Sequence, residues 1–429
     1  FHASRVHYSN RVTRKTEARM PPSSRYRVLM LLENNPYPQD PRVSREVRAL
    51  VDAGYQVAII APGDPDQARH ELLDGVRVYR FPAPPPAPGL LGYLWEYGYS
   101  MVVMFLLSLV ALWRDGFDVV HAHNPPDTLV FIGAFYKLLG KRFVYDHHDL
   151  APELYYARFG GTGNRWVHKT LVWLETLSCR LADHVITTNQ SHKALEMARS
   201  GIPGDNITIV RNGPDPSRLC PVAPDPALLA KGKTIIAYSG MMGVQDGIDY
   251  LLRALRHLAY DLERRDFFCI LLGGRGEAVA SLQALSRELG LDEYVWFAGW
   301  ISDRDEYARY LSSADICVDP DPSNPYNDRS TMIKMMEYMA MAKPIVAFDL
   351  PEHRFSAQAA ALYVRPNDEL EFARAIAQLM DDPAHRQTMG ALGRRRVETE
   401  LAWHHSAPNL LAAYQALQAG RLGERLPSL

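Results

Sequence analysis

Cysteine is scarce in this chain of 429 residues. The cysteines lie far apart and show neither the spacing of a zinc site nor a disulfide framework, which fits a reducing compartment. With 47% hydrophobic and 22% charged residues, the chain has an ordinary globular composition and ample length for two domains. The four cysteines are Cys179, Cys220, Cys269 and Cys317.

A strong excess of one charge is also absent, since the formal net charge is -2. Residues 1–27 carry seven Lys or Arg against Glu17 alone, so the remainder has 40 basic against 48 acidic residues, a balance of -8. This balance excludes a nucleic-acid-binding protein of the usual basic kind. We expect residues 1–25 to form a disordered basic tail. The tail lacks the apolar core of a signal peptide, and Met20 is a plausible start.

A hydrophobic run of membrane-spanning length is not expected either. The uncharged segment Met101–Trp113 has thirteen residues, whereas a spanning helix needs about 20. A buried helix is the first interpretation. Shallow insertion into the face of a bilayer is the alternative, because residues 93–99 and Trp113 supply aromatic side chains that suit a membrane interface. Any membrane contact would then be peripheral and run through residues 93–113.

Short apolar runs alternate with helical stretches twice along the chain. Many runs are rich in Val and Ile and apolar on both faces, which is typical of parallel strands covered by helices. The pattern predicts two doubly wound, Rossmann-like α/β domains facing a cleft, at residues 26–213 and 232–403. Residues 214–231 would link them, and a last helix at 404–420 would pack back on the first domain. The expected strands are Val28–Leu32, Val57–Ala61, Val119–Ala122, Phe143–Asp146, Val185–Thr188, Ile207–Val210, Thr234–Tyr238, Phe268–Leu272, Val295–Ala298, Ile316–Asp319, Ile345–Phe348 and Ala361–Val364.

The most informative segment runs from Asn327 to Asp349. Ser330 and Thr331 are good N-cap residues and predict a helix that continues to about Met341. This helix is apolar almost all round, and Glu337 lies on an apolar stripe. A buried carboxylate needs a partner, which could be the hydroxyl pair of a bound ligand near the anion-favouring helix start. The alternative is a core helix whose buried glutamate is tied to a neighbouring backbone.

This segment resembles the donor-nucleotide motif of retaining, family-4 glycosyltransferases with the GT-B fold. Further blocks resemble the same family, in the same order, and the resemblance covers about residues 26–420. It implies transfer of a sugar, with retention, from an NDP-sugar co-substrate to a glycan acceptor of surface polysaccharide biosynthesis. The acceptor would be lipid-linked if residues 93–113 touch a membrane. The further blocks are DVVHAHNPPD (118–127), FVYDHHDLAPE (143–153), ADHVITTNQS (182–191), TIVRNGPD (208–215), LLGGRGE (271–277) and VWFAGWIS (295–302).

The resemblance also implies roles for individual residues. His148 and Asp149 would contact the transferred sugar as catalytic residues, and Glu337 would bind the ribose. No further cofactor and no metal are implied, and the enzyme would be cytoplasmic, at most peripheral at the inner membrane face. The remaining donor-side residues would be Ser330, Thr331, Asp328, Gly240 and Gly243, and the acceptor side would include Asp40, Arg42 and His123.

Three departures from the family pattern bear on these roles. Met241 and Asp246 stand where the family has a phosphate-binding Arg and Lys, so the diphosphate needs other cations. Arg329 stands at the place of a first glutamate, with Asp328 one residue away. The loop Glu33–Arg42 replaces a glycine-rich loop, so Asp40 and Arg42 either touch a substrate or only start a helix. The candidate cations are Arg329 and Lys334, followed by Arg275 and Arg211.

Three alternatives stay open. The chain could be a UDP-sugar 2-epimerase of the same fold, or a non-catalytic partner subunit. The third concerns a metal, because histidines and aspartates gather at two neighbouring strand ends. That group comprises His121, His123, His147, His148, Asp127 and Asp149.

Overall fold

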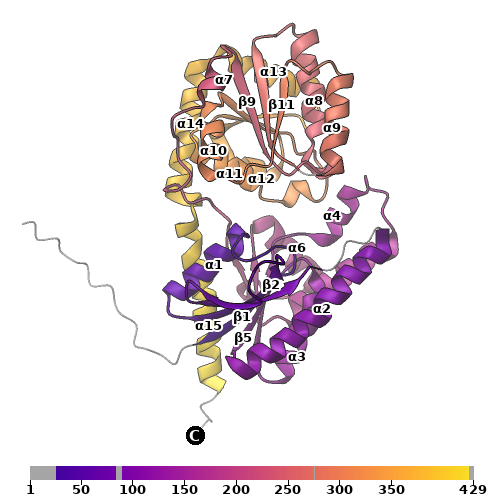
Figure 1. Ribbon diagram of the computed structural model, residues 1–429, viewed down its shortest axis with the longest axis vertical. Coiled ribbons are helices and arrows are strands. Elements are labelled where there is room, and N and C mark those ends of the chain that lie inside the picture. The colour runs from indigo at the N-terminus through magenta and orange to yellow at the C-terminus, as the bar shows by residue number, and fades with distance from the viewer. Residues whose placement is uncertain (1–25, 84–88, 275, 425–429) are drawn as a thin grey trace, which may run out of the picture.

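The computed structural model describes residues 26–83, 89–274 and 276–424 (Figure 1). The expected basic tail and Arg275 therefore lie outside the described residues. Two α/β domains stack along the long axis of the molecule, each with its own sheet and covering helices. All twelve strands expected from the sequence are present, with ends that differ by at most two residues.

The first domain has an eight-stranded sheet in the order β3-β4-β2-β1-β5-β6-β7-β8. All neighbouring strands are parallel except β3 and β4. Buried apolar side chains line both faces of the sheet, as a parallel sheet between helical layers requires. The strands are β1 (Arg27–Leu31), β2 (Gln56–Gly63), β3 (His70–Leu73), β4 (Val76–Pro82), β5 (Val119–His123), β6 (Arg142–His147), β7 (His184–Thr187) and β8 (Ile207–Ile209). The helices are α1 (Pro41–Asp52), α2 (Gly89–Arg114), α3 (Val130–Leu138), α4 (Ala151–Arg158), α5 (Arg165–Leu181) and α6 (Gln190–Ser200), with 3-10 turns η1 (Asp127–Leu129) and η2 (Gly204–Asn206).

The hairpin β3–β4 was not expected from the sequence. Its two-residue loop is Asp74-Gly75, with φ angles of 49° and 84°. Positive φ at both loop positions is the tight-turn geometry that joins antiparallel strands, and an Asp-Gly pair is its usual sequence. The signal was therefore present, but β3 is short and partly exposed, so the apolar pattern did not reveal it.

The second domain has an all-parallel sheet in the order β11-β10-β9-β12-β13-β14. Its core again occupies both faces of the sheet. The strands are β9 (Thr234–Gly240), β10 (Phe267–Gly273), β11 (Val295–Gly299), β12 (Ile316–Asp319), β13 (Ile345–Phe348) and β14 (Ala361–Val364). The helices are α7 (Pro226–Leu229), α8 (Ile248–Arg256), α9 (Glu277–Glu288), α10 (Arg304–Ser313), α11 (Ile333–Ala340), α12 (Pro351–Ala357), α13 (Glu369–Asp381) and α14 (Pro383–Arg396), with short turns η3 (Val244–Asp246), η4 (His257–Asp261), η5 (Asn327–Arg329), η6 (Gln358–Ala360) and η7 (Val397–Leu401).

The last helix, α15 (Trp403–Glu424), runs from the second domain down the side of the first (Figure 1). The hydroxyl of Tyr414 lies 2.7 Å from His121 Nδ1 at the centre of the first sheet. The Asn409 side chain donates to the Ile209 carbonyl of β8 over 3.1 Å. The chain thus crosses between the domains twice, and α15 is anchored by side chains on the first domain.

The interpretation of Met101–Trp113 as a buried helix holds for its inner face, where Met101, Val103 and Phe105 pack on the core, but not for its outer face. The segment belongs to the 26-residue helix α2, and its stretch Trp95–Arg114 is only 22% buried. Ser100, Met104, Ser108 and Ala111 form the narrow buried stripe. By length and composition alone the stretch could cross a membrane, a test that many core helices also pass.

Candidate functional site

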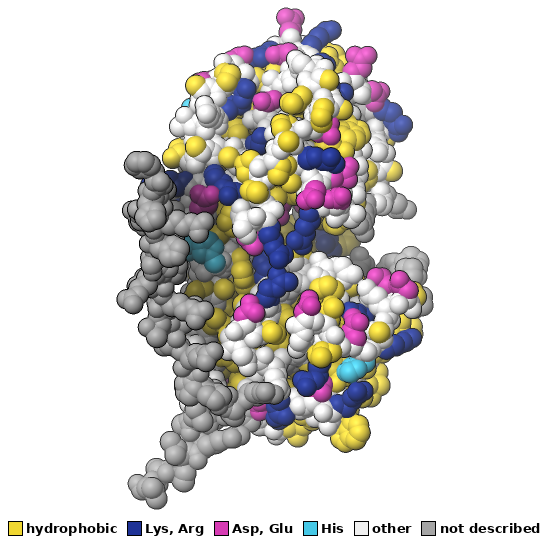
Figure 2. Space-filling view, turned by 60° about the vertical axis from the view of Figure 1, so that its left-hand side comes forward, with side chains coloured by type: hydrophobic (Ala, Val, Ile, Leu, Met, Phe, Trp, Pro, Cys, Tyr) yellow, Lys and Arg dark blue, Asp and Glu magenta, His cyan; other side chains and the backbone are white. Residues whose placement is uncertain are grey.

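The strand ends of the two domains face each other, and side chains bridge between them. The Asn189 side-chain amide, just after β7, donates to the Arg329 carbonyl over 2.8 Å and to Thr331 Oγ1 over 2.9 Å. Figure 2 shows lysine and arginine side chains gathered where the domains meet. Ligands of doubly wound sheets bind beyond the carboxyl ends of the strands, so this junction is the natural place for a substrate.

A second bridge is electrostatic. Arg211, which follows β8, lies 3.5 Å from a Glu352 carboxylate oxygen and donates to Thr331 Oγ1 over 3.2 Å. Ser191 donates to the same Glu352 carboxylate over 2.6 Å. Burial lowers the pKa of Arg211, although the Glu352 charge opposes that shift. The charge of Arg211 is thus already paired, which leaves less of it for a diphosphate.

His148 and Asp149, the expected catalytic pair, lie at the junction. Their backbone amides donate to Asn124 Oδ1 over 2.9 and 3.2 Å, which fixes the turn after β6. The Tyr326 hydroxyl of the second domain donates to Asp149 Oδ1 over 3.1 Å. Within the described part of the chain neither ring nitrogen of His148 has a hydrogen-bond partner, and a carboxylate oxygen of Asp146 lies 3.7 Å from His148 Nδ1.

Glu337, the expected ribose ligand, has a protein partner in the structure. The Tyr307 hydroxyl donates to Glu337 Oε2 over 2.7 Å, and that hydroxyl also lies 2.8 Å from Ser239 Oγ at the end of β9. Burial raises the pKa of Glu337, while the Tyr307 hydrogen bond and the charge of Arg45 act against the rise. The partner is therefore a side chain rather than a backbone group, and it holds one of the two carboxylate oxygens.

The start of α11 differs from the expectation. The helix begins at Ile333 after Met332, and no side chain caps it. Ser330 Oγ donates instead to the Tyr326 carbonyl over 2.8 Å, and Thr331 Oγ1 serves the interdomain contacts described above. The two hydroxyls are thus committed to the loop and the domain bridge, which is why the helix starts later.

The expected phosphate-binding cations are differently placed. Lys334 Nζ lies 3.2 Å from Asp319 Oδ1 and 2.6 Å from Asp321 Oδ1. Burial lowers the pKa of Lys334, but these carboxylates raise it well above its ordinary value, so the ammonium stays charged and fully paired. Arg329 is less committed, because its Nη1 donates to a backbone carbonyl, that of Pro325, over 2.8 Å.

The loop after β9 is acidic rather than basic, as the sequence predicts. Asp246 Oδ2 accepts from the Gly243 amide over 2.8 Å, and burial raises the pKa of Asp246. Gly240 lies at the strand end with φ 152°, and a Cβ on the neighbouring Gly273 would approach the Gly240 carbonyl oxygen to 2.1 Å. Glycine is thus required where β9 and β10 meet. The carboxylate of Asp328, in η5, accepts from Ser323 over 3.3 Å.

On the acceptor side, the helix-start interpretation of Asp40 is confirmed. Its carboxylate caps α1 by accepting from the Arg42 and Val43 amides over 3.0 Å each. Arg42 Nη2 lies 3.6 Å from Asp40 Oδ2. His123 is fully buried, and its Nδ1 lies 2.7 Å from Asp146 Oδ2.

The six-residue metal group considered from the sequence is divided by the structure. His147 points to α6, with Nδ1 2.7 Å from Glu196 Oε1. Burial lowers the pKa of His147, but the Glu196 hydrogen bond and the charge of Glu175 raise it to about 9. Asp127 instead accepts from Tyr145 over 2.5 Å. His121 and His123 remain together, with stacked rings 4.2 Å apart.

Sequence reasoning missed four residues that shape the junction. Tyr307 and Tyr326 are ordinary aromatic residues in the sequence, and only the fold brings them to Glu337 and Asp149. Arg45, on α1, donates to the Gly213 carbonyl over 2.7 Å and lies near enough to Glu337 to influence its pKa. Asn189 lies in the block ADHVITTNQS (182–191), but no feature of the sequence indicates its role.

Two family models match this chain. The model described as "Glycosyl transferase 4-like domain" matches residues 39–213, and "Glycosyl transferases group 1" matches residues 233–382. The chain is 25% identical to the glycogen synthase of Mycobacterium tuberculosis over 400 residues, covering 88% of this chain and 90% of the relative. It is 23% identical to the 2-deoxystreptamine glucosyltransferase of Streptomyces kanamyceticus over 389 residues, covering 87% and 97%.

Solved structures support the same fold. The sucrose-phosphate synthase of Thermosynechococcus elongatus matches with TM-score 0.76 and 22% identity, over 92% of this chain and 100% of that one. Anabaena HepE in complex with UDP-glucose matches with TM-score 0.67 and 16% identity, over 91% and 99%. The two facing parallel-sheet domains define a GT-B fold. The chain belongs to the group 1, 4-like glycosyltransferases and is a transferase enzyme.

Proposed function

We propose that the enzyme transfers a sugar, with retention, from an NDP-sugar to a glycan acceptor in surface polysaccharide biosynthesis. The observation that carries the donor site is Glu337, a carboxylate at the cleft that is held by Tyr307. A carboxylate fixed in this way can accept hydrogen bonds from both hydroxyls of a ribose. Relatives whose structures hold UDP or UDP-glucose support a nucleotide donor.

The transferred sugar would lie between Glu337 and the turn after β6. The ring nitrogens of His148 form no hydrogen bond with the described residues, and Nδ1 lies 3.7 Å from Asp146, so the ring can donate a hydrogen bond to a sugar hydroxyl. Asp149 has one carboxylate oxygen held by Tyr326 of the opposite domain, so its position depends on closure of the cleft. Catalysis would come from holding donor and acceptor in line and from stabilising the departing diphosphate.

Arg329 is the best cation for the departing diphosphate. Its guanidinium is partly exposed and keeps most of its donors, whereas Lys334 is bound to Asp319 and Asp321. Ser330 and Thr331, with Gly240 and Gly243 of the loop after β9, would line the diphosphate, although the Gly243 amide already donates to Asp246. No separate cofactor takes part in this proposal.

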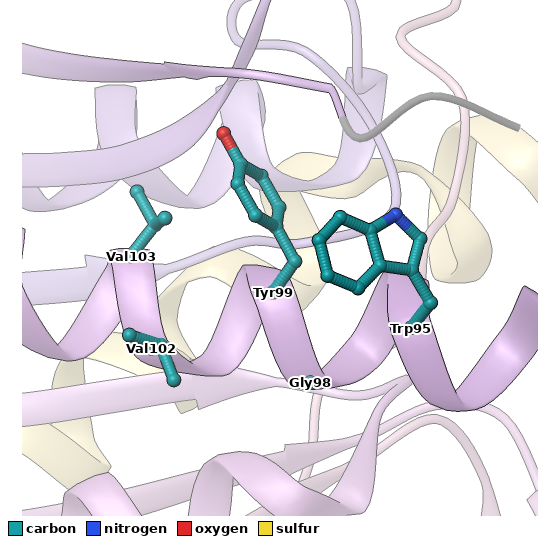
Figure 3. Close-up of a pocket in the computed structure, with 5 residues that line it drawn as sticks. All are labelled: Trp95, Gly98, Tyr99, Val102 and Val103. Atoms are coloured by element: carbon teal, nitrogen blue, oxygen red, sulfur yellow. The ribbon is translucent and has the colours of Figure 1, made fainter.

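The acceptor would be lipid-linked, and α2 would touch the cytoplasmic face of a membrane. Its outward side chains include Val102, Leu106 and Trp113, which are 61%, 55% and 85% exposed. Figure 3 shows the rings of Trp95 and Tyr99 one turn apart on α2. The two side chains line an apolar hollow of about 440 Å³. Apolar patches of this kind on a soluble fold mark interaction sites, and a bilayer accepts an aliphatic face flanked by Trp and Arg.

A thermal-shift panel with UDP, GDP, ADP and their common sugars tests the donor site. A ligand that binds the folded state raises the melting temperature, and we expect one base to do so in the wild type and to fail in Glu337→Ala. A product assay with that NDP-sugar and acceptor extracts then tests transfer, with the anomeric configuration read by NMR. If no nucleotide shifts the wild-type protein, the donor proposal is wrong and the non-catalytic subunit takes its place.

A further inference from the structure

Four side chains of types that bind metals meet beside the turn after β6. This turn carries His148 and Asp149 and is called the catalytic turn below. Glu46 comes from α1, His121 and His123 from β5, and Asp146 from β6, and all four are at most 2% exposed. One ligand atom of each lies within 4.8 Å of the others. His121 Nε2 lies 4.0 Å from Glu46 Oε2 and 3.9 Å from Asp146 Oδ2, and His123 Nδ1 lies 2.7 Å from Asp146 Oδ2.

Three polar atoms of this cluster have no hydrogen-bond partner among the residues that the structure describes. They are Glu46 Oε2, His121 Nε2 and His123 Nε2. Leaving a buried polar atom without a partner is destabilising, and more so when it is charged. Two carboxylates and two imidazoles around one point therefore leave lone pairs that the surrounding protein does not satisfy.

A second acidic cluster in the chain differs in one respect, because a lysine enters it, although buried atoms of Asp319 and His353 there also have no hydrogen-bond partner among the described residues. Asp319, Asp321 and His353 also lie within ligating distance of one another. There Lys334 Nζ enters the cluster, 2.6 Å from Asp321 Oδ1. Within the described ranges, no lysine or arginine forms an ion pair with Glu46 or Asp146. The guanidinium of Arg42, on the same helix as Glu46, lies 3.6 Å from Asp40 Oδ2.

The orientation of His121 is fixed from outside the cluster. Its Nδ1 lies 2.7 Å from the Tyr414 hydroxyl of α15, and its other nitrogen faces the carboxylates. If the imidazole Nδ1–H donates to that hydroxyl, Nε2 presents its lone pair inward. An outer hydrogen bond that sets the tautomer and the ring direction is the usual support of a metal-bound histidine.

We propose that Glu46, His121, His123 and Asp146 bind one divalent transition-metal ion, with zinc as the best match. Two imidazoles and two carboxylates suit zinc, and four protein ligands without an open position indicate a structural site. The ion would join α1, β5 and β6 and would hold Asp146, whose other oxygen lies 3.7 Å from His148 Nδ1. It would position the catalytic turn without touching the substrate.

The competing explanation is a proton shared by the carboxyl groups of Glu46 and Asp146. Elemental analysis of the tag-free full chain, expressed with added zinc, separates the two. We expect about one zinc per chain that survives gel filtration, and a lower melting temperature after a strong chelator that zinc reverses. A folded wild-type protein that contains no transition metal and takes none up from added zinc, manganese or iron overturns the proposal.

The variant Glu46→Gln sharpens this test. Glutamine imitates a protonated glutamate in shape, so a shared-proton cluster would keep its melting temperature, whereas a metal site would lose a charged ligand and most of its zinc. Asp321→Asn is the matched control, because it alters a buried acidic cluster served by Lys334. We expect it to leave the zinc content unchanged. Equal zinc in wild type and in both Glu46→Gln and His121→Gln would mean that the ion binds elsewhere.

Discussion

The Tyr307 hydroxyl donates a hydrogen bond to the carboxylate of Glu337 over 2.7 Å. The two residues come from neighbouring helices of the second domain, α10 and α11. Tyr307 thereby fixes the rotamer of the one carboxylate on α11, a helix whose only other charged residue is Lys334. The same hydroxyl lies 2.8 Å from Ser239, so the position of Glu337 is tied to the end of β9. The predicted ribose ligand is thus held ready before any nucleotide arrives.

The first prediction concerns the contribution of this carboxylate. We expect Glu337→Gln to weaken nucleotide binding by about 10- to 100-fold, because hydrogen bonds to a charged group contribute about 1.5–3 kcal/mol. Tyr307→Phe should weaken it less, since the carboxylate remains but is less well fixed. Isothermal titration calorimetry with the nucleotide selected by thermal shift measures both. Unchanged affinity in Glu337→Gln would assign the glutamate to the core.

The second prediction is a pH dependence. Burial raises the pKa of Glu337, so the folded protein takes up this proton at a higher pH than an exposed glutamate would. Ribose hydroxyls bind the ionised form, so affinity should be highest above the raised pKa and fall as the pH drops through it. The affinity of one nucleotide for wild type and for Glu337→Gln is measured between pH 4.5 and 8. Protonation of the nucleotide's phosphates affects both proteins equally, so the difference between the two profiles reports on Glu337. If affinity depended on pH in the same way in both proteins, protonation of Glu337 would not be the cause of the pH dependence.

Much of the fold could be predicted from the sequence, because its strands are buried on both faces. The continuous apolar run Ile345–Phe348, for example, predicts a strand whose first and last residues are those of β13. The hairpin β3–β4 escaped because its exposed strand β3 carries no apolar run. The exposed outer face of α2 could not be predicted, because a helix with an aliphatic exposed face and a helix of the core have similar sequences.

The candidate site was less predictable, because its contacts join residues far apart in the chain. Glu337 stood out as a charge on an apolar stripe, but its partner Tyr307 has no mark in the sequence. Lys334 was read as a phosphate ligand because it lies near a helix start, yet the fold places two aspartates from the end of β12 around it. Local patterns identify which groups need partners, and the tertiary structure decides which partners they receive.

The third prediction concerns domain closure. Thr331→Val removes the hydroxyl that accepts from Asn189 and Arg211 while keeping its shape. Because each hydrogen bond contributes about 1 kcal/mol, we expect the ratio of closed to open molecules to fall roughly 5- to 30-fold. Small-angle scattering should then show a larger radius of gyration, and KM for the donor should rise. Asn409→Ala is the control, because it removes a hydrogen bond between α15 and β8 outside the junction. An unchanged radius in Thr331→Val would show that other contacts set the closure.

The fourth prediction tests the outer face of α2. Leu106→Lys places a charge on the exposed aliphatic face, and we expect co-sedimentation with zwitterionic phosphatidylcholine vesicles, which do not attract the added lysine, to fall several-fold. The melting temperature should hardly change, since Leu106 is 55% exposed. Leu72→Lys is the control, because Leu72 is 70% exposed on β3, away from α2. Wild-type protein that stays wholly in the supernatant would contradict the membrane proposal.

The fifth prediction separates structure from function at Lys334. Lys334→Met leaves the buried carboxylates of Asp319 and Asp321 without their cation. Removing one partner of a buried ion pair costs about 3–5 kcal/mol, so the free energy of unfolding should fall by that amount. The double variant Lys334→Met/Asp321→Asn should recover part of the loss, because the two changes share one interaction. Chemical denaturation measures both effects. If Lys334→Met instead keeps the stability and loses only nucleotide affinity, the lysine serves the diphosphate, and the aspartates must then carry protons of their own.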